Sequence, residues 1–331
     1  MAVLLVWTVY MLLADQSPAQ LWRGLRCAHL PFLILGFGLM LLYVGCEAAS
    51  TCLVLRTLGT PAPLRRCLSY ACVGFYFSTV TPSSTGGQPM QVYTMTRDGI
   101  PGAHGTLDML LISACYQTAS ALYALAAWLV FPALPAGLGR GLWALLLFGF
   151  ITTLLLTAGM VLLLVRPGWC VKLADLAAGL LRRLPFVKDP DGLRARWDGP
   201  IAQYAQGGRV LWRRPHLIPA LLGLSLMQLT CLYLVPWTVY RAFGLSGHNV
   251  FELVALQSLM AVAVGFLPLP GSTGAAESAF LQSFAAFFGG LVTPAVVLSR
   301  GISCYLMLVI TGIVAFALHM RRRKQKSAEL F

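Results

Sequence analysis

Charged residues are scarce in this chain. They make up 11% of its 331 residues, whereas 58% of the residues are hydrophobic and the mean hydropathy is +0.76. A soluble domain carries about a quarter of its residues as charged side chains. The composition therefore excludes an ordinary soluble globular protein and predicts an integral membrane protein.

Acidic residues are the rarest of the charged groups. The chain has 11 acidic residues against 24 basic ones, which gives a formal net charge of +13. In a soluble domain this excess would suggest a nucleic-acid partner. Here the basic residues gather in a few loops between apolar stretches, which indicates membrane topology and no nucleic-acid partner.

Signatures of catalysis are also missing. The sequence has no Gly-x-x-x-x-Gly-Lys-Ser/Thr loop for a nucleotide, no His-Glu-x-x-His motif and no Cys-x-x-Cys pair. The nine cysteines are scattered, and we interpret them as small buried hydrophobes. We expect no catalytic residue, no metal site and no cofactor.

Long apolar runs dominate the chain instead. Full-length candidates for spanning a bilayer core of about 30 Å are 31–55, 107–131, 141–165, 215–240 and 293–320. The stretch 1–13 is shorter, and it lacks a basic start and a cleavage site, so we expect a truncated or tilted first span. The fold class is therefore an all-α polytopic membrane protein with about six transmembrane helices.

Two further apolar stretches are interrupted by the same motif, Pro-x-Ser-Thr-Gly. The first copy is 82–86, inside 67–97, and the second is 270–274, inside 250–289. Lipid offers no partner to unpaired backbone groups, so such breaks are tolerated only inside protein or beside water. Matched breaks are typical of a transporter's binding site near the membrane midplane. Two ordinary loops between spans are the alternative.

The basic residues orient these pieces. The segment 166–214 holds ten basic residues against four acidic, and Arg321 to Lys326 forms a basic tail, so both belong in the cytoplasm. The hairpin 67–97 then enters from the cytoplasm, and 250–289 enters from outside. The interpretation is a single membrane domain over 1–331.

An inverted repeat follows from the opposite entry of the two hairpins. Its units are 31–131 and 215–320, joined by the span 141–165 and the cytoplasmic segment 166–214. Within that segment, leucine and alanine recur at helical spacing from Leu173 to Leu184. This pattern predicts an amphipathic helix, either along the membrane interface or on the protein's inner face.

Charged residues at membrane depth usually mark a pathway. Glu47, Glu277 and Arg300 lie within apolar stretches, and Arg97 closes the first hairpin. Glu277 alternatively satisfies a helix dipole, and Arg300 pairs with Glu277 or reaches the outer interface. Half-helix N-termini beside the breaks suit an anion such as a phosphate, unless their hydroxyls only cap the helices. The candidate substrate-binding residues are Pro82, Ser84, Thr85, Gly86, Gly87, Gln88, Arg97, Pro270, Gly271, Ser272, Thr273, Gly274, Glu277, Arg300 and Glu47.

The runs 81–89 (Thr-Pro-Ser-Ser-Thr-Gly-Gly-Gln-Pro) and 268–277 (Pro-Leu-Pro-Gly-Ser-Thr-Gly-Ala-Ala-Glu) resemble the paired signatures of the lysylphosphatidylglycerol synthase membrane-region family. The second signature is often Pro-x-Pro-Gly-Gly-x-Gly-x-x-Glu in that family, and Ser272 replaces its second glycine here. The resemblance covers nearly the whole chain. It implies flippase-like movement of a phospholipid or glycolipid headgroup, in the best-known members an aminoacylated phosphatidylglycerol linked to resistance against cationic antimicrobial peptides.

One departure from the bifunctional members affects the expected activity. Those members carry a soluble C-terminal domain that transfers lysine to the lipid, whereas this chain stops eleven residues after Met320. We therefore expect no phosphatidylglycerol lysyltransferase activity. A secondary transporter of a small anionic solute, or a non-transporting partner of a lipid-modifying or glycosyl-transferring enzyme, stays open.

The expected location is the cell membrane, with both termini cytoplasmic. The expected partners are membrane lipids with anionic phospholipid headgroups. A second copy of the chain and a lipid-modifying enzyme stay open as protein partners.

The topology is testable by cysteine labelling. A single cysteine at Thr60 should react only with a reagent applied from the cytoplasmic side, and one at Gly247 only from outside. Reaction from the reverse sides would contradict the inverted repeat.

Overall fold

The structure is a computed structural model that describes residues 28–82, 84–136, 139–166, 168, 169, 171, 175, 214–267 and 274–328. The proposed short span 1–13, nearly all of the amphipathic segment and the second break loop, 268–273, lie outside the described residues.

The described residues form helices and no strand. The helices of the first half are α3 (Leu30–Thr57), α4 (Leu64–Val80), α5 (Gly87–Arg97), α6 (Gly102–Val130), the short α7 (Ala133–Ala136) and α8 (Arg140–Val165). Those of the second half are α11 (Leu217–Tyr233), α12 (Val235–Ala242), α13 (Val250–Val264), α14 (Ala275–Ser283), α15 (Ala285–Phe288), α16 (Val292–Arg300) and α17 (Met307–Ala328). A 3₁₀ turn (Gly289–Leu291) precedes α16, and a π-helical turn (Gly301–Leu306) separates α16 from α17.

Five described segments are long and apolar enough to cross a membrane: Leu30–Thr57, Gly102–Val130, Arg140–Leu163, Leu217–Ala242 and Ala285–Leu318. They correspond to the five full-length spans expected from hydropathy. The prediction of an all-α polytopic membrane protein is confirmed.

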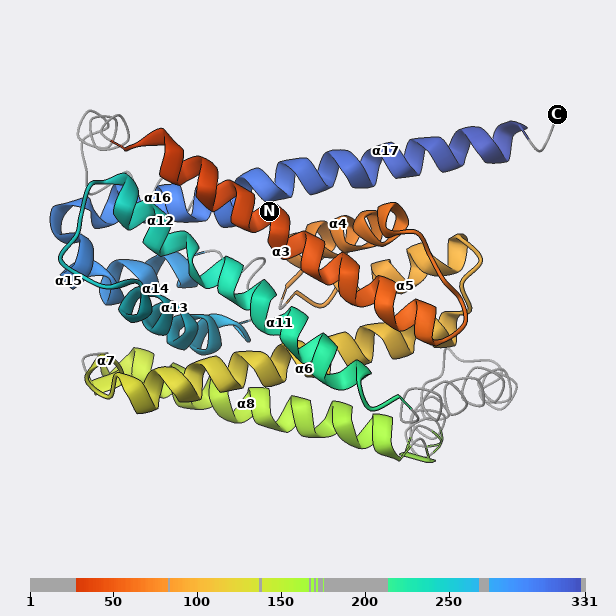
Figure 1. Cartoon of the computed structure of the whole chain (residues 1–331), viewed down its shortest axis with the longest axis horizontal. Coiled ribbons are helices and arrows are strands. Elements are labelled where there is room, and N and C mark those ends of the chain that lie inside the picture. Colours follow the sequence, from red (N-terminus) through yellow and green to blue (C-terminus); the bar gives the residue numbers. More distant parts are fainter. Residues whose placement is uncertain are drawn as a thin grey trace, which may run out of the picture.

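Both broken stretches form pairs of short helices. In the first, α4 packs on α5 across the break at 81–86, and in the second α13 packs on α14. Figure 1 shows α4 and α5 at one end of the bundle and α13 to α15 at the other. The inverted repeat requires the two hairpins to lie at opposite ends. It also requires each hairpin to enter from an opposite face of the bilayer, and this stays a prediction.

The two halves pack directly against each other. Helix α3 contacts α11 and α12, and α17 of the second half packs on α4 of the first. Helix α8 instead lies along α6 and α13, and much of its surface is exposed, including Leu155 at 68%. An exposed apolar side chain on a spanning helix is what contact with lipid requires.

Small residues allow close approach between these helices. A Cβ atom on Gly36 would lie 2.7 Å from the Thr238 hydroxyl of α12, and one on Gly149 would overlap the carbonyl of Val262 in α13. Small residues are enriched where transmembrane helices meet, because association there depends on close van der Waals packing. Glycine at these positions therefore sets the distance between helices.

The cysteines behave as the sequence suggested. Seven of them lie in the described residues, all are free thiols, and five of these are buried. None of the described cysteines forms a disulfide.

Gly149 offers a direct test of this packing. Gly149→Ala should push α8 away from α13 and destabilise the fold by about 1–3 kcal/mol, as overpacking does. Gly159→Ala on the same helix is the control, because a Cβ there meets nothing within 4 Å and alanine favours helix. Thermal unfolding in detergent measures both, and equal melting temperatures for the two variants would contradict the close contact.

Candidate functional site

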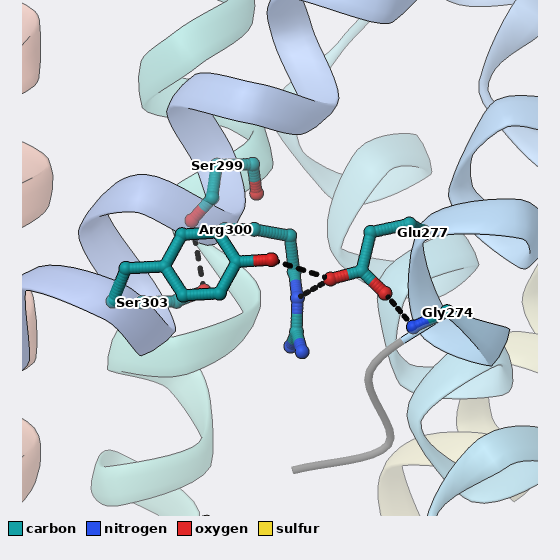
Figure 2. A network of polar contacts seen from close by, with 6 residues as sticks. Gly274, Glu277, Ser299, Arg300 and Ser303 are labelled. Atoms are coloured by element: carbon teal, nitrogen blue, oxygen red, sulfur yellow. Dashed lines mark hydrogen bonds and ion pairs between the residues drawn. The ribbon is translucent and has the colours of Figure 1, made fainter. Parts of the chain in front are cut away.

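The carboxylate of Glu277 connects three segments of the second half. Its Oε2 atom accepts a hydrogen bond from the Gly274 backbone N–H at 2.6 Å, at the start of α14. Its Oε1 atom accepts from Arg300 Nε at 2.9 Å and from the Tyr305 hydroxyl at 3.0 Å. Figure 2 shows Glu277 between Gly274 and Arg300. Glu277 thus caps the start of α14 and pairs with Arg300, so the structure contains both the helix-terminal role of Glu277 and the ion pair that the sequence had left open.

Gly274 has the backbone geometry that this arrangement needs. Its φ angle is +88°, in the region that L side chains rarely adopt. The N–H of Gly274 points back to the Glu277 side chain three residues later. A carboxylate in the first turn also interacts favourably with the helix dipole. Glu277 is only 2% exposed, so these contacts replace water almost completely.

Arg300 ends α16, directly before the π-helical turn. Isolated π turns inside α-helices are frequent at functional sites, because the wider turn redirects side chains. Ser303 and Cys304 lie in this turn, and Ser303 Oγ donates to the Ser299 carbonyl, 2.8 Å away. The turn places Arg300, Ser303 and Cys304 on the wall of one cavity.

That cavity has a volume of about 260 Å³ and lies between the two halves of the chain. Its lining comes from α3, α4 and the first break on one side, and from α11, α16 and the π turn on the other. The lining residues are Tyr43, Glu47, Gly74, Phe75, Ser78, Thr79, Ser84, Leu232, Arg300, Ser303 and Cys304. An acidic and a cationic side chain from opposite halves of the chain, Glu47 and Arg300, therefore line the same cavity.

Neutral amides hold Glu47. Gln91 Nε2 of α5 donates a hydrogen bond to Glu47 Oε1 at 2.7 Å. The amide of Gln228 in α11 also interacts with this carboxylate. Gln91 reaches Glu47 only because Gly74 has no side chain, since a Cβ on Gly74 would overlap the Gln91 amide. Gly87 likewise sits against Ser78 and the Gly74 carbonyl. The glycines of the first hairpin thus place one wall of the cavity.

The first break makes its own local hydrogen bonds. Thr81 Oγ1 accepts from the Gly86 N–H at 2.9 Å, and Thr85 Oγ1 donates to the Pro82 carbonyl at 2.9 Å. Ser84 has a φ of +57°, uncommon for a residue with a side chain, and it lines the cavity. The hydroxyl of Thr85 therefore stabilises the break, while Ser84 faces the cavity.

Other sequence candidates lie elsewhere. Gln88 is exposed and donates to Ser113 Oγ at 2.6 Å. Arg97 stacks on Tyr93 at the end of α5, with its Nε 3.1 Å from the Tyr93 hydroxyl. Neither belongs to the cavity lining. The candidates in the second break, Pro270, Gly271, Ser272 and Thr273, lie outside the described residues.

Sequence reasoning missed several residues. Gln91, which donates a hydrogen bond to Glu47, and Gln228, which also interacts with it, are both buried, and Asp108 of α6 is fully buried. Glu47 was selected because it is a charged residue inside an apolar stretch. The same criterion would have selected Asp108, which lies inside the stretch 107–131. Tyr305 carried no such signal, because tyrosines are common in membrane helices.

The family described as lysylphosphatidylglycerol synthase TM region matches residues 1–311. The chain belongs to this family. The resemblance inferred from the two break motifs is confirmed. Comparisons with curated proteins and with solved structures gave no match. In this member of the family, the second motif supplies Glu277, whose side-chain partners, Arg300 and Tyr305, come from the last spanning segment.

The ion pair is measurable by a double-mutant cycle. Removing one partner of a buried pair costs about 3–5 kcal/mol, because the other charge stays buried. Glu277→Gln and Arg300→Gln should each destabilise strongly, and the double variant should lose clearly less than their sum. Unfolding free energies in detergent provide the measurement.

Arg97→Gln is the matched control for the loss of an arginine. Its guanidinium lies at an exposed end of α5, where a cation–π contact contributes only about 0.5–1 kcal/mol. Additive losses for Glu277 and Arg300, or an Arg97 effect of equal size, would contradict the pairing.

Proposed function

We propose that this protein moves the polar headgroup of a phospholipid or glycolipid between the two leaflets of the membrane, in the manner of a flippase. The observation that carries the proposal is the cavity between the two halves, with Arg300 on one wall and Glu47 on the other. Membership of a membrane-region family named for a lipid synthase supports the substrate class.

The volume of the cavity favours a headgroup over a whole lipid. Pockets that enclose drug-sized ligands measure about 300–1,000 Å³, and this cavity is somewhat smaller at about 260 Å³. A diacyl lipid exceeds that space several-fold. Its acyl chains must therefore stay in the bilayer while the headgroup occupies the cavity.

The charges favour a headgroup that carries both signs. Arginine binds phosphate through paired N–H donors, and the bond from Arg300 Nε to Glu277 fixes the direction of its guanidinium. Glu47 on the other wall suits an ammonium group. Aminoacylated phosphatidylglycerol has an anionic phosphate and a cationic amine, so it is the headgroup that we propose.

The polar side chains of the lining suit a headgroup that passes through the cavity more than one that is bound tightly. Ser78, Thr79, Ser84 and Ser303 offer hydroxyl groups without fixed charge. A transported group must bind well enough to enter and weakly enough to leave. Hydroxyl partners between two charged anchors meet both requirements.

A matched pair of variants tests the proposal in proteoliposomes containing headgroup-labelled aminoacylated phosphatidylglycerol. Ser303→Leu should fill the cavity and slow transfer at least about tenfold, a barrier increase of about 1.4 kcal/mol. Thr152→Leu on α8 is the control, because Thr152 lies away from the cavity lining and, like Ser303, donates to the carbonyl four residues earlier.

The outcomes separate the remaining functions. Uptake of a water-soluble anion without lipid transfer would replace the flippase proposal with a solute transporter. Transfer of neither by the folded protein would favour a partner role beside a lipid-modifying enzyme. Equal slowing by both variants would remove the cavity from the pathway.

A further inference from the structure

Buried polar atoms without hydrogen-bond partners gather beside the first hairpin. Eight such side-chain atoms occur among the described residues, and half belong to three neighbouring helices: both carboxyl oxygens of Asp108 in α6, Thr51 Oγ1 in α3 and Gln91 Oε1 in α5. Asp108 and Thr51 are 0% exposed, and Gln91 is 3% exposed. Buried polar groups normally have partners, so this concentration requires an explanation.

Helix geometry arranges these groups in a row. Glu47 and Thr51 are four residues apart on α3, and His104 and Asp108 are four apart on α6, so each pair lies on one helix face. Thr51 is near enough to the Asp108 carboxyl to interact with it, although neither side chain has a hydrogen-bond partner among the described residues. The row therefore runs from Glu47 through Thr51 and Asp108 to His104.

The two ends of the row differ in their surroundings. Glu47 lines the cavity between the halves. His104 is half-buried near the start of α6, and its Nδ1 lies 3.3 Å from the Thr60 hydroxyl beyond the end of α3. This is the end of the bundle where the first hairpin begins (Figure 1). By position, the row thus extends from one end of the protein towards the cavity.

Among the described residues, no cation interacts with Asp108. In the described part of the chain, the groups that interact with it are Thr51 and Glu47 of α3 and Cys67 of α4. No group of α5, α8, α11 or α13, which also pack on α6, is among them. An isolated ionised carboxylate in such surroundings costs several kcal/mol, and a neutral acid avoids this cost.

We propose that Asp108 is a proton-binding site that exchanges its proton with Glu47 in the cavity and so couples headgroup movement to a proton gradient. The coupling rests on the proposed function, whereas the proton site does not. It would make the protein a proton-coupled transporter of its lipid.

The transfer step balances without a further reactant. The Asp108 O–H bond breaks as its proton passes to the Thr51 oxygen. The Thr51 hydroxyl then releases its own proton to the Glu47 carboxylate. Thr51 and Glu47 are one helical turn apart, so a water molecule carries the proton between them. Asp108 becomes a carboxylate and Glu47 a neutral acid, so the total charge is unchanged. A Glu47 that has gained a proton no longer attracts an ammonium group, which links proton transfer to headgroup release.

Infrared spectroscopy of the purified protein tests the proton site alone. At neutral pH the wild-type protein should show the carbonyl stretch of a buried neutral carboxylic acid, and Asp108→Asn should lack it. Asp98→Asn is the control, because Asp98 lies near the same end of the bundle and accepts a hydrogen bond from Tyr70 at 2.8 Å. A wild-type spectrum without this band would overturn the proposal, even if Asp108→Asn failed to fold.

Vesicles with a pH difference of one unit test the coupling. One proton per headgroup at one pH unit supplies about 1.4 kcal/mol, so wild-type protein should distribute the labelled lipid about tenfold unequally between leaflets. Asp108→Asn should let the lipid equilibrate and accumulate none, whereas Asp98→Asn should behave as wild type.

The failures are distinguishable. Absence of any lipid movement by the wild-type protein would reject the flippase proposal, and the infrared band would still decide the proton site. Lipid movement that ignores the pH gradient, or that responds only to a sodium gradient, would overturn proton coupling. Thr51→Val, which keeps the shape of the side chain, should weaken the response to the pH gradient if the hydroxyl passes the proton.

Discussion

The second half of the site depends on the hydrogen bonds and the ion pair that the Glu277 carboxylate makes. This carboxylate joins the start of α14 at Gly274 to the end of α16 at Arg300 and to the π turn at Tyr305. Charges and unpaired backbone groups are costly in a membrane protein's interior, so each of these segments needs the others. The positions of Arg300 and Ser303 on the cavity wall follow from this requirement.

In the first half of the chain, the geometry of the cavity depends on glycines, which have no side chain to separate the helices. Gly74 and Gly87 let α4 and α5 approach so closely that Gln91 of α5 reaches Glu47 of α3. A methyl group on Gly74 would occupy the place of that amide. One half of the cavity thus rests on an ion pair and the other on close helix packing, which is the usual means of association between helices in lipid.

Hydropathy was sufficient to predict the helical class and the five long spans, because the bilayer thickness sets the length of a span. The cost of charge at depth identified Glu47, Glu277 and Arg300, and the break motif identified Ser84. Arg97 and Gln88, which the sequence also selected, lie outside the cavity lining, because a position at either end of a short helix does not tell whether the side chain turns inward. The π turn has no sequence signature, so the companions of Arg300 were not predictable from spacing.

The way in which each charge is held supports the proposed binding and release of a headgroup in the cavity. Arg300 is paired with Glu277, and amide side chains of Gln91 and Gln228 hold Glu47. A direct bridge between Glu47 and Arg300 would close the space between the halves, and each headgroup would have to break it. Separate partners orient the two charges and leave them on opposite walls, so a phosphate and an amine can engage both without first breaking a bridge across the cavity. Since the walls belong to different halves of the chain, a bound headgroup would link those halves, and its release would let them move relative to each other.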